Sequence, residues 1–383
     1  MSKPLNVLII EDSEDDTLLL VRELRRGGYM PHYRRVDRSD AMAAALSEEP
    51  WDVILSDHNM PHFSSTTALE LAKASGIDVP FMIVSGSIGE EVAVRAMKAG
   101  AQDYLMKGNL ARLCAAVERE LQDAADRRAR QQAEKALLAQ QEDLRVAREI
   151  QQRLFPAVHP VLPGFDIAGT SRPAEATGGD YYDFIPMRNG QLGVVVGDVT
   201  GHGLGPAMLM ADVRAYLRAL TLAHDGIRDI LAKADSLLSR DLGCERFITL
   251  VMVSLGPAAR RIAYVNAGHP DGYIVDAQGR IRERLQAMVP ALGLIPDERF
   301  PEAVSAPLEP GDLLLLMTDG VTEACSPAGE EFGVDRALAV AREARHRPAG
   351  DIVEAIVTAV LAFAGTARLQ DDITVVAVKA LAA

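Results

Sequence analysis

The sequence predicts a chain of three parts: a parallel α/β unit over residues 1–115, a helical connector over 116–155 and an α+β layered unit over 156–383. In the first part, short apolar runs alternate with helical patterns, which is typical of parallel sheets. The second part has a helix-forming composition without glycine or proline between Val117 and Leu154. The third holds strands in series and two pairs of helices, which indicate a β-sandwich flanked by helices.

Composition narrows the class of protein. A chain of 383 residues with 48% apolar residues can bury two or three cores. Its net charge of −14 disfavours nucleic acid as a partner, since phosphate binding needs a basic surface. Cys114, Cys244 and Cys325 are scattered, as expected in a reducing cytosol. The chain has no apolar run near ~18 residues and no signal-peptide pattern. We therefore expect a cytoplasmic protein without membrane contact.

The first part is expected to form a five-stranded parallel sheet with its site at the carboxyl ends of the strands. Recognisable strand patterns are Leu5–Ile10, Val53–Ser56, Val79–Val84 and Asp103–Met106. Helical patterns are Asp15–Arg26, Ala41–Glu48, Thr66–Ala74 and Glu90–Lys98.

An acidic cluster with one lysine follows these strands. Glu11 and Asp12 come after the first strand, Asp57 after the third, Ser85 after the fourth and Lys107 after the fifth. This set suits phosphorylation of an aspartate. Glu11 and Asp12 would hold Mg²⁺, Lys107 would offset the phosphoryl charge, and Asp57 would be the nucleophile. Any single carboxylate could equally be a turn residue at a strand end.

The motifs Ile-Ile-Glu-Asp, Leu-Ser-Asp-His-Asn-Met-Pro, Ile-Val-Ser-Gly and Asp-Tyr-Leu-Met-Lys resemble those of the receiver domain of two-component response regulators, which has a flavodoxin-like fold. The resemblance implies a cognate histidine kinase and Asp57 as phosphoacceptor. Asp12 would be the main ligand of Mg²⁺, with Asp57 and the Asn59 carbonyl beside it. Ser85 and Tyr104 would be the switch pair, together with the lysine after the fifth strand.

The sequence departs from the receiver pattern at two positions. Ser65 stands where glycine is usual, and Gly108 follows the lysine where proline is usual. Neither change removes a chemical group. His58 and His62 bracket Pro61, which breaks the helix needed to align them, so we expect loop residues and not zinc ligands.

The connector is expected to be one long helix. A seven-residue repeat is partly traced by Leu137, Leu144, Ala147, Gln151 and Leu154. A homodimeric coiled coil and a lone helix packed on its neighbours both fit this pattern. In either case the connector would link the two flanking units mechanically.

The third part carries four aspartates at strand ends: Asp180, Asp198, Asp319 and Asp371. The first two each follow a glycine, which lets the backbone approach a ligand closely or simply turn. Four carboxylates without cysteines or paired histidines favour Mg²⁺ or Mn²⁺ over Zn²⁺. Two such ions could clamp a phosphate ester and activate a water molecule, so no serine or cysteine nucleophile is needed.

Five motifs occur in order: Gly-Gly-Asp-Tyr-Tyr-Asp-Phe, Gly-Asp-Val-Thr-Gly-His-Gly, Asn-Ala-Gly-His-Pro, Thr-Asp-Gly-Val-Thr-Glu-Ala and Asp-Asp-Ile-Thr-Val-Val. They resemble metal-dependent phosphatases of the protein phosphatase 2C-like class, in the bacterial branch that regulates sporulation and stress sigma factors. The resemblance implies that Asp198 bridges two ions and the Val199 carbonyl contacts one. Asp319 and Asp371 would bind the other ion, and Asp180 would support the second.

Five further positions are weighed on the same resemblance. Thr200 replaces the histidine proposed as general acid in eukaryotic relatives, and His202 is more simply a turn residue. His269 is expected to be structural, and Arg172 is a weak candidate for phosphate binding. Asp371 is preferred over Asp372 as ligand because the family pattern is Asp-Asn-x-Thr/Ser.

The favoured hypothesis is a serine/threonine phosphatase controlled by phosphorylation of Asp57, with an anti-sigma factor antagonist as substrate. By analogy, phosphorylation is expected to activate it through the connector. The alternative is a non-enzymatic adaptor whose phosphatase-like domain only binds a partner. A DNA-binding regulator fits poorly, because no basic recognition helix follows the connector.

Overall fold

The structure is a computed structural model. It describes residues 2–61, 63–86, 90–201, 203–241, 246–256, 260–295, 299–305, 307–365 and 369–382. The predictions for His62, His202 and Cys244 fall outside these ranges. Contacts divide the chain into two compact units, Met1–Ala139 and Gln140–Ala383. The predicted three-part boundaries stay a prediction, because the connector helix begins in one unit and ends in the other.

The first unit contains the predicted parallel five-stranded sheet, in the order β2-β1-β3-β4-β5. Its strands are β1 (Lys3–Ile10), β2 (Tyr29–Val36), β3 (Val53–Asp57), β4 (Phe81–Ser85) and β5 (Asp103–Met106). Its helices are α1 (Glu14–Arg26), α2 (Ser39–Glu48), α3 (Ser65–Ala74), α4 (Glu90–Lys98) and the short 3₁₀ helix η1 (Lys107–Arg112). Apolar side chains of α1, of η1 and of residues 113–117 cover one face, and those of α2 and α3 cover the other. The α/β prediction is confirmed.

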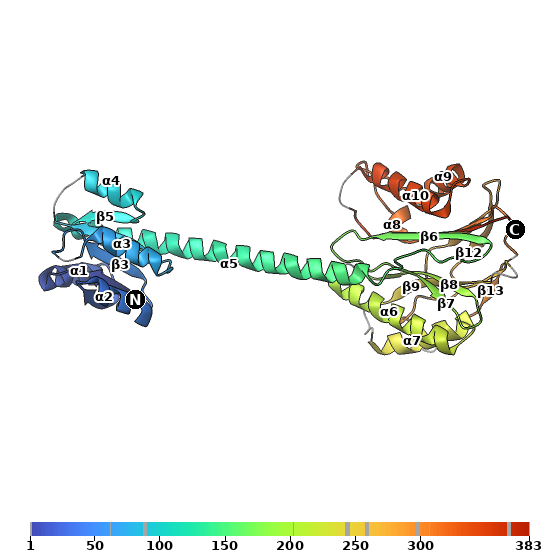
Figure 1. The fold of residues 1–383 in the computed structure, drawn as a ribbon, viewed down its shortest axis with the longest axis horizontal. Helices are drawn as coiled ribbons and strands as arrows, with labels where there is room; N and C mark the ends of the chain where they lie inside the picture. The colour runs from blue at the N-terminus through green and yellow to red at the C-terminus, as the bar shows by residue number, and fades with distance from the viewer. Residues whose placement is uncertain are drawn as a thin grey trace. The chain divides into compact units, whose positions relative to one another are not determined.

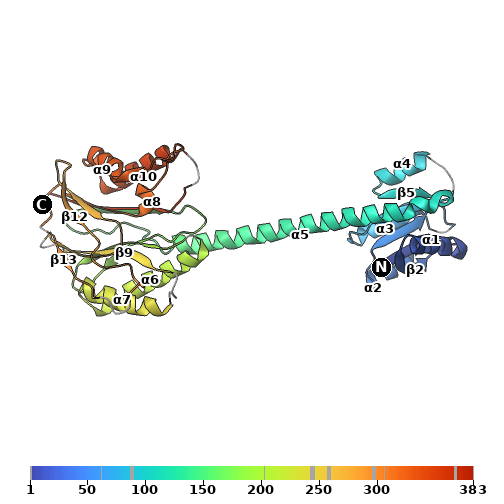
Figure 2. The ribbon, with the colours of Figure 1, turned by 180° about the vertical axis from the view of Figure 1, so that it is seen from behind.

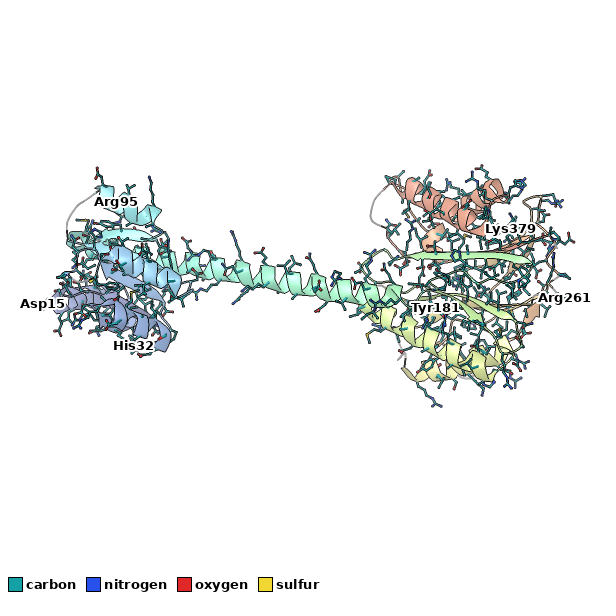
Figure 3. The ribbon with its side chains drawn as sticks, in the orientation of Figure 1. Asp15, His32, Arg95, Tyr181, Arg261 and Lys379 are labelled. Atoms are coloured by element: carbon teal, nitrogen blue, oxygen red, sulfur yellow. The ribbon has the colours of Figure 1, made fainter. Side chains whose placement is uncertain are left out.

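One strand of this sheet has no clear sequence signal. β2 reads Tyr-Met-Pro-His-Tyr-Arg-Arg-Val and lies at the sheet edge, with His32 labelled in Figure 3. Only Tyr29 and Val36 of this strand are buried. Charged residues and proline are typical of edge strands, because one side of such a strand faces solvent. The apolar runs that reveal central strands are therefore missing.

The connector is a single helix, α5 (Leu113–Gln152), as predicted. Leu113 lies in the core of the first unit, whereas residues 125–143 are exposed throughout. The predicted heptad residues divide along the helix: Leu137 is 55% exposed, but Gln151 is only 6% exposed. Leu154, just after α5, packs on a core of the second unit. The C-terminal part of the predicted heptad repeat therefore packs against this chain's own second unit, and the homodimer stays a prediction.

The second unit contains two five-stranded antiparallel sheets. Their orders are β13-β10-β9-β8-β7 and β12-β11-β14-β15-β6. The strands are β6 (Phe165–Arg172), β7 (Tyr181–Pro186), β8 (Leu192–Val199), β9 (Ile248–Leu255), β10 (Ile262–Ala267), β11 (Gly272–Val275), β12 (Ile281–Leu285), β13 (Ala303–Val304), β14 (Leu313–Met317) and β15 (Ile373–Ala380).

Helices cover the outer faces of both sheets. α6 (Leu204–Ala223) and α7 (Ile227–Asp241) pack on the first sheet, whereas α9 (Gly333–Ala344) and α10 (Ala349–Ala364) pack on the second. The short α8 (Asp319–Thr322) follows β14. A third apolar core fills the space between the sheets. Figures 1 and 2 show this order of layers from opposite sides. The predicted helix-flanked β-sandwich is confirmed.

Four elements of this unit have weak sequence signals. β12 is a charged edge strand, and β13 and α8 are very short. β7 comes from Tyr-Tyr-Asp-Phe-Ile-Pro, whose polar residues resemble a turn. Tyr181 and Asp183 nevertheless lie on one face of the strand and are both buried. A buried polar pair on one face hides the alternation expected of a strand. No described helix is both long and apolar enough to span a membrane.

Candidate metal centres

The four aspartates of the second unit meet where the two sheets come together. Asp180 directly precedes β7 and Asp198 lies near the end of β8, both in the first sheet. Asp319 is the second residue after β14 and Asp371 lies two residues before β15, and both of these strands are in the second sheet. Neighbouring strands β7 and β8, and likewise β14 and β15, pair antiparallel. Strand pairing thus brings Asp180 near Asp198 and Asp319 near Asp371, although each pair is separated in the sequence.

The carboxylates of this cluster repel one another electrostatically. Burial, then repulsion from Asp319 and Asp371, raises the pKa of Asp198 to about 7. Burial and the charge of Asp198 raise the pKa of Asp180 well above its ordinary value. Carboxylates that destabilise one another in this way are stabilised by a cation among them. The electrostatics of the cluster therefore suit a divalent metal.

Asp180 is held in place from the opposite sheet. Its side chain is 2% exposed, and the Thr318 hydroxyl donates to its Oδ2 at 2.8 Å. The N–H of Thr374 in turn donates to the Thr318 hydroxyl at 3.0 Å. Asp180 therefore keeps a fixed orientation and is shielded from solvent. This suits a residue that supports a metal ion from the buried side of the site.

The backbone leaves room beside Asp198. A Cβ atom on Gly179 would lie 2.5 Å from the Val199 carbonyl oxygen and 3.2 Å from Oδ1 of Asp198. Glycine is thus required for the close approach of the two segments. The donor set consists of carboxylate and carbonyl oxygens, which Mg²⁺ and Mn²⁺ prefer. These residues fit the predicted cofactors.

The first unit offers a tighter oxygen cluster. Glu11, Asp12 and Asp57 each place one carboxylate oxygen within 4.8 Å of the others, and they are the one such trio among the described residues. The aspartates of the second unit are more widely spaced, so water molecules would have to complete the coordination of ions there. Mg²⁺ commonly keeps several waters in protein sites.

Lys107 lies beside the trio. Its Nζ is 2.9 Å from Glu11 Oε2 and 3.4 Å from Asp57 Oδ2, and it also contacts Asp16. Burial opposes the charge of Lys107, but the hydrogen bonds that its ammonium group donates to Asp16 and Glu11 raise its pKa above the ordinary value. Lys107 is therefore a permanent cation next to Asp57.

The remaining predicted residues of this unit lie around the same strand ends. Asn59 is exposed in the loop after β3, Ser85 ends β4 and Tyr104 lies in β5. His58 Nδ1 lies 2.8 Å from the buried Ser65 hydroxyl, so this histidine already has a partner at the start of α3.

Three candidates of the second unit have other partners. His269 is buried, and this burial lowers its pKa to about 3, so the ring is neutral at physiological pH. The Thr200 hydroxyl donates to the Phe247 carbonyl at 3.2 Å. The Arg172 guanidinium pairs with Glu354 at 3.1 Å. The neutral His269 ring and the hydrogen-bonded Thr200 hydroxyl are thus poor general acids, and the charge of Arg172 is already paired.

Sequence reasoning missed the residues that support the ligands. Asp372 binds backbone N–H groups of the Asp180 segment, and Thr318 holds the Asp180 carboxylate. Asp183 is fully buried, receiving two hydrogen bonds from Arg218 and one from Tyr181, which is labelled in Figure 3. Sequence spacing carries no signal for such contacts, because the partners are far apart along the chain.

A groove opens beside this centre. It has a volume of about 720 Å³. Its lining includes Asp371 with Glu175, Glu323 and Ser326. A protein segment could reach the candidate metal centre along it.

Two family descriptions match the chain. "Stage II sporulation protein E (SpoIIE)" matches residues 188–381, and "Response regulator receiver domain" matches residues 7–118. Both fall on stretches whose motifs predicted such a resemblance.

Curated relatives share parts of this arrangement. Protein IcfG of Synechocystis is 27% identical over 404 residues, covering 97% of this chain and 58% of that protein. Phosphoserine phosphatase RsbU of Bacillus subtilis is 25% identical over 181 residues, covering 47% of this chain and 53% of RsbU. The chain thus spans little more than half the length of these relatives.

Solved structures show the same fold. The RsbU and RsbW domains of a Mycobacterium tuberculosis protein align with a TM-score of 0.50 and 28% identity, over 58% of this chain and 62% of that one. The SiaA-PP2C domain of Pseudomonas aeruginosa aligns with a TM-score of 0.55 and 22% identity, over 64% of this chain and 98% of that one. The latter likeness concerns the fold alone.

Proposed function

Because the chain belongs to the stage II sporulation protein E (SpoIIE) family and carries a response regulator receiver domain before it, we propose that it is a phosphorylation-controlled, metal-dependent protein serine/threonine phosphatase. The observation that carries the proposal is the convergence of four aspartates from both sheets, with the pKa of Asp198 raised to about 7. This arrangement suits two divalent cations and the hydrolysis of a phosphate ester.

Each aspartate has a role in the proposal. Asp198 would bridge two Mn²⁺ or Mg²⁺ ions, with the Val199 carbonyl beside it. Asp319 and Asp371 would complete one ion's ligands, and Asp180 would support the other. When bound, the ions would supply an activated water molecule and offset phosphate charge. The protein's own part is to hold these oxygens at fixed positions.

The substrate would be a phosphoserine or phosphothreonine on a regulatory protein. RsbU, the relative described above, is named a phosphoserine phosphatase. We propose an anti-sigma factor antagonist as the substrate class. A groove of about 720 Å³ lies beside Asp371, where a phosphorylated side chain could approach the candidate metal centre.

Control would come from the receiver. A cognate histidine kinase would supply the phosphoryl group that Asp57 accepts, with Glu11 and Asp12 holding Mg²⁺ beside it. The cation of Lys107, 3.4 Å from Asp57, would offset the added charge. Phosphorylation of Asp57 would activate the phosphatase through α5, with Ser85 and Tyr104 as the switch residues.

The decisive experiment measures Mn²⁺-dependent phosphate release from a phosphorylated antagonist protein by the full chain. Asp198→Ala and Asp319→Ala should each lose release by orders of magnitude, whereas Asp225→Ala, at an exposed site between α6 and α7, should match wild type. Full activity in either ligand variant contradicts the proposal. Tight capture of the phosphoprotein without turnover would favour the adaptor function instead.

A further inference from the structure

The ammonium group of Lys107 is held by a carboxylate that does not belong to the predicted phosphorylation site. Asp16, in the first turn of α1, accepts a hydrogen bond from Lys107 Nζ at 2.5 Å. The distances from the same nitrogen to Glu11 and Asp57 are longer, at 2.9 and 3.4 Å. Lys107 therefore pairs more closely with Asp16 than with the predicted phosphoacceptor.

The start of α1 fixes Asp16 in this place. The Ser13 hydroxyl caps the helix and accepts the N–H of Asp16 at 3.2 Å. The N–H of Ser13 in turn donates to Glu11 Oε1 at 3.2 Å, so the cap is tied to the acidic cluster itself. The side chain of Asp16 is 38% exposed and that of Lys107 only 16%. The pair is thus partly shielded from water, which makes its charge interaction stronger than that of a fully exposed pair.

Stabilisation of the helix alone does not account for this contact. Acidic residues are favoured in the first turn of a helix because they interact with its dipole. Glu14 and Asp15 occupy the same turn as Asp16, and both of their side chains are exposed. Of these three residues, Asp16 is the one that pairs with Lys107. Asp16 therefore has a specific partner as well as a favourable position in the helix.

Phosphorylation of Asp57 would require Lys107 to change partners. An ammonium group has three N–H donors, and the carboxylates of Asp16, Glu11 and Asp57 already surround it. A phosphoryl group on Asp57 would add negatively charged oxygens, which form strong hydrogen bonds with a cation. Asp16 has no role of its own in metal binding or phosphoryl transfer in the proposed function. Its contact with Lys107 therefore competes with the phosphoryl group.

We propose that Asp16 is a positioning residue for Lys107: it holds the ammonium group away from Asp57, which leaves the acidic trio open to Mg²⁺ and makes the phosphorylated state less stable. The inference rests on the proposed phosphorylation of Asp57. Because the Asp16–Lys107 contact must break each time Asp57 accepts a phosphoryl group, Asp16 shifts the receiver toward its unphosphorylated form.

The test uses the full chain and two probes. Mg²⁺ alone is titrated by calorimetry, and beryllofluoride, a mimic of an aspartyl phosphoryl group, is titrated at saturating Mg²⁺. Asp16→Asn keeps the shape of the side chain but removes its charge, so the ammonium group of Lys107 moves toward the trio. Mg²⁺ should then bind about 3- to 10-fold more weakly, and beryllofluoride about 3- to 10-fold more tightly. A general structural defect would weaken the binding of both probes.

Asp15→Asn is the matched control. It removes the same charge from the neighbouring residue of the same turn, whose side chain is exposed, and should bind both probes as wild type does. Asp16→Glu restores the charge and should return both affinities toward wild type. A further readout is the NMR signal of the Lys107 ammonium group, which should shift in Asp16→Asn but not in Asp15→Asn.

Three results would overturn the proposal. They are wild-type affinities for both probes in folded Asp16→Asn, weaker binding of both probes in that variant, and equal changes in Asp15→Asn. If Asp16→Asn does not fold, the same criteria apply to Asp16→Ala.

The two proposals fail separately. A wild-type protein that binds no beryllofluoride and gains no phosphoryl group would overturn the proposed phosphorylation of Asp57. The Mg²⁺ titration and the ammonium signal would still show whether Asp16 holds Lys107 away from the trio, because neither measurement needs a phosphoryl group.

Discussion

Asp371 and Asp372 are adjacent in the chain, yet their carboxylates have opposite surroundings. The side chain of Asp372 is 5% exposed and accepts the N–H groups of Ala174 and Gly179, each at 2.7 Å. Asp371 is exposed and lines the groove beside the candidate metal centre. The pair therefore divides two tasks: Asp371 is open to the groove, where it could bind a metal, and Asp372 anchors the segment that carries Asp180.

Replacement of each aspartate by alanine should separate these tasks. Asp372→Ala leaves buried N–H groups unpaired and should lower the free energy of unfolding by about 2–3 kcal/mol. Asp371→Ala should change it by no more than about 0.5 kcal/mol, while phosphate release is lost. Urea unfolding in the presence of a chelator measures the first effect. Equal destabilisation by both variants would contradict this division.

Gly179 should not tolerate a side chain. In Gly179→Ala the new Cβ would lie 2.5 Å from the Val199 carbonyl oxygen, so the two segments must separate. We expect a loss of about 1–3 kcal/mol in stability and markedly weaker Mn²⁺ binding by calorimetry. Gly226→Ala is the control, since a Cβ there meets no atom within 4 Å. Wild-type Mn²⁺ affinity in Gly179→Ala would refute the close-approach argument.

Metal binding should depend on pH around neutrality. Burial and neighbouring carboxylates raise the pKa of Asp198 to about 7, so the folded protein holds a proton there that the unfolded chain releases near pH 4. Without metal, this residue's contribution to stability therefore falls as pH rises between about 4 and 7. Mn²⁺ competes with that proton, so its affinity should increase as pH rises through about 7.

The check is a comparison with Asp198→Asn in chelator, by urea unfolding at about pH 5 and about pH 8. The variant cannot titrate at this position. The loss of stability between the two pH values should therefore be smaller in the variant than in wild type. An identical pH dependence in both proteins would exclude Asp198 as the titrating group.

The buried charge of Asp183 should depend on Arg218. The guanidinium donates to both carboxylate oxygens, at 2.6 and 2.7 Å. Arg218→Ala would leave this buried charge without its main partner, at a cost of about 3–5 kcal/mol. Arg228→Ala removes an exposed guanidinium from the next helix and should cost under about 1 kcal/mol. Thermal unfolding of the two variants would show whether this difference exists.

Phosphorylation of the receiver should require Asp57. The full chain, incubated with acetyl phosphate and Mg²⁺, should gain one phosphoryl group by intact-protein mass spectrometry, and Asp57→Asn should gain none. The phosphorylated wild type should release substrate phosphate faster than the untreated protein. Slower release would leave phosphorylation intact but reverse the predicted sign of control.

Sequence patterns were most informative where apolar runs or helix-forming composition dominate. The central strands of both units and the long α5 follow directly from them. The edge strands β2 and β12 escaped because their charged residues face solvent and interrupt the apolar pattern. β7 escaped because Asp183 is polar but buried, its charge balanced by an arginine from α6.

The site shows the same division. Glycine-preceded aspartates are visible in the sequence, because close approach of the backbone demands glycine at those positions. Gln151 and Thr318 carry no such mark. Gln151 fits a heptad position, and only the fold reveals that its amide faces Gly178 and not a second helix. Supporting residues are defined by a partner distant in sequence, which spacing alone does not encode.

The location of the aspartates at the junction of the two sheets has a mechanical consequence. Asp180 and Asp198 adjoin or lie in strands of one sheet, and Asp319 and Asp371 adjoin strands of the other. The hydrogen bond from Thr318 to Asp180 already links the two sheets of the sandwich. An ion shared by Asp198 and Asp319 would be a second link between the two sheets. A shortage of the metal would then lower the stability of the sandwich as well as abolish the catalytic activity.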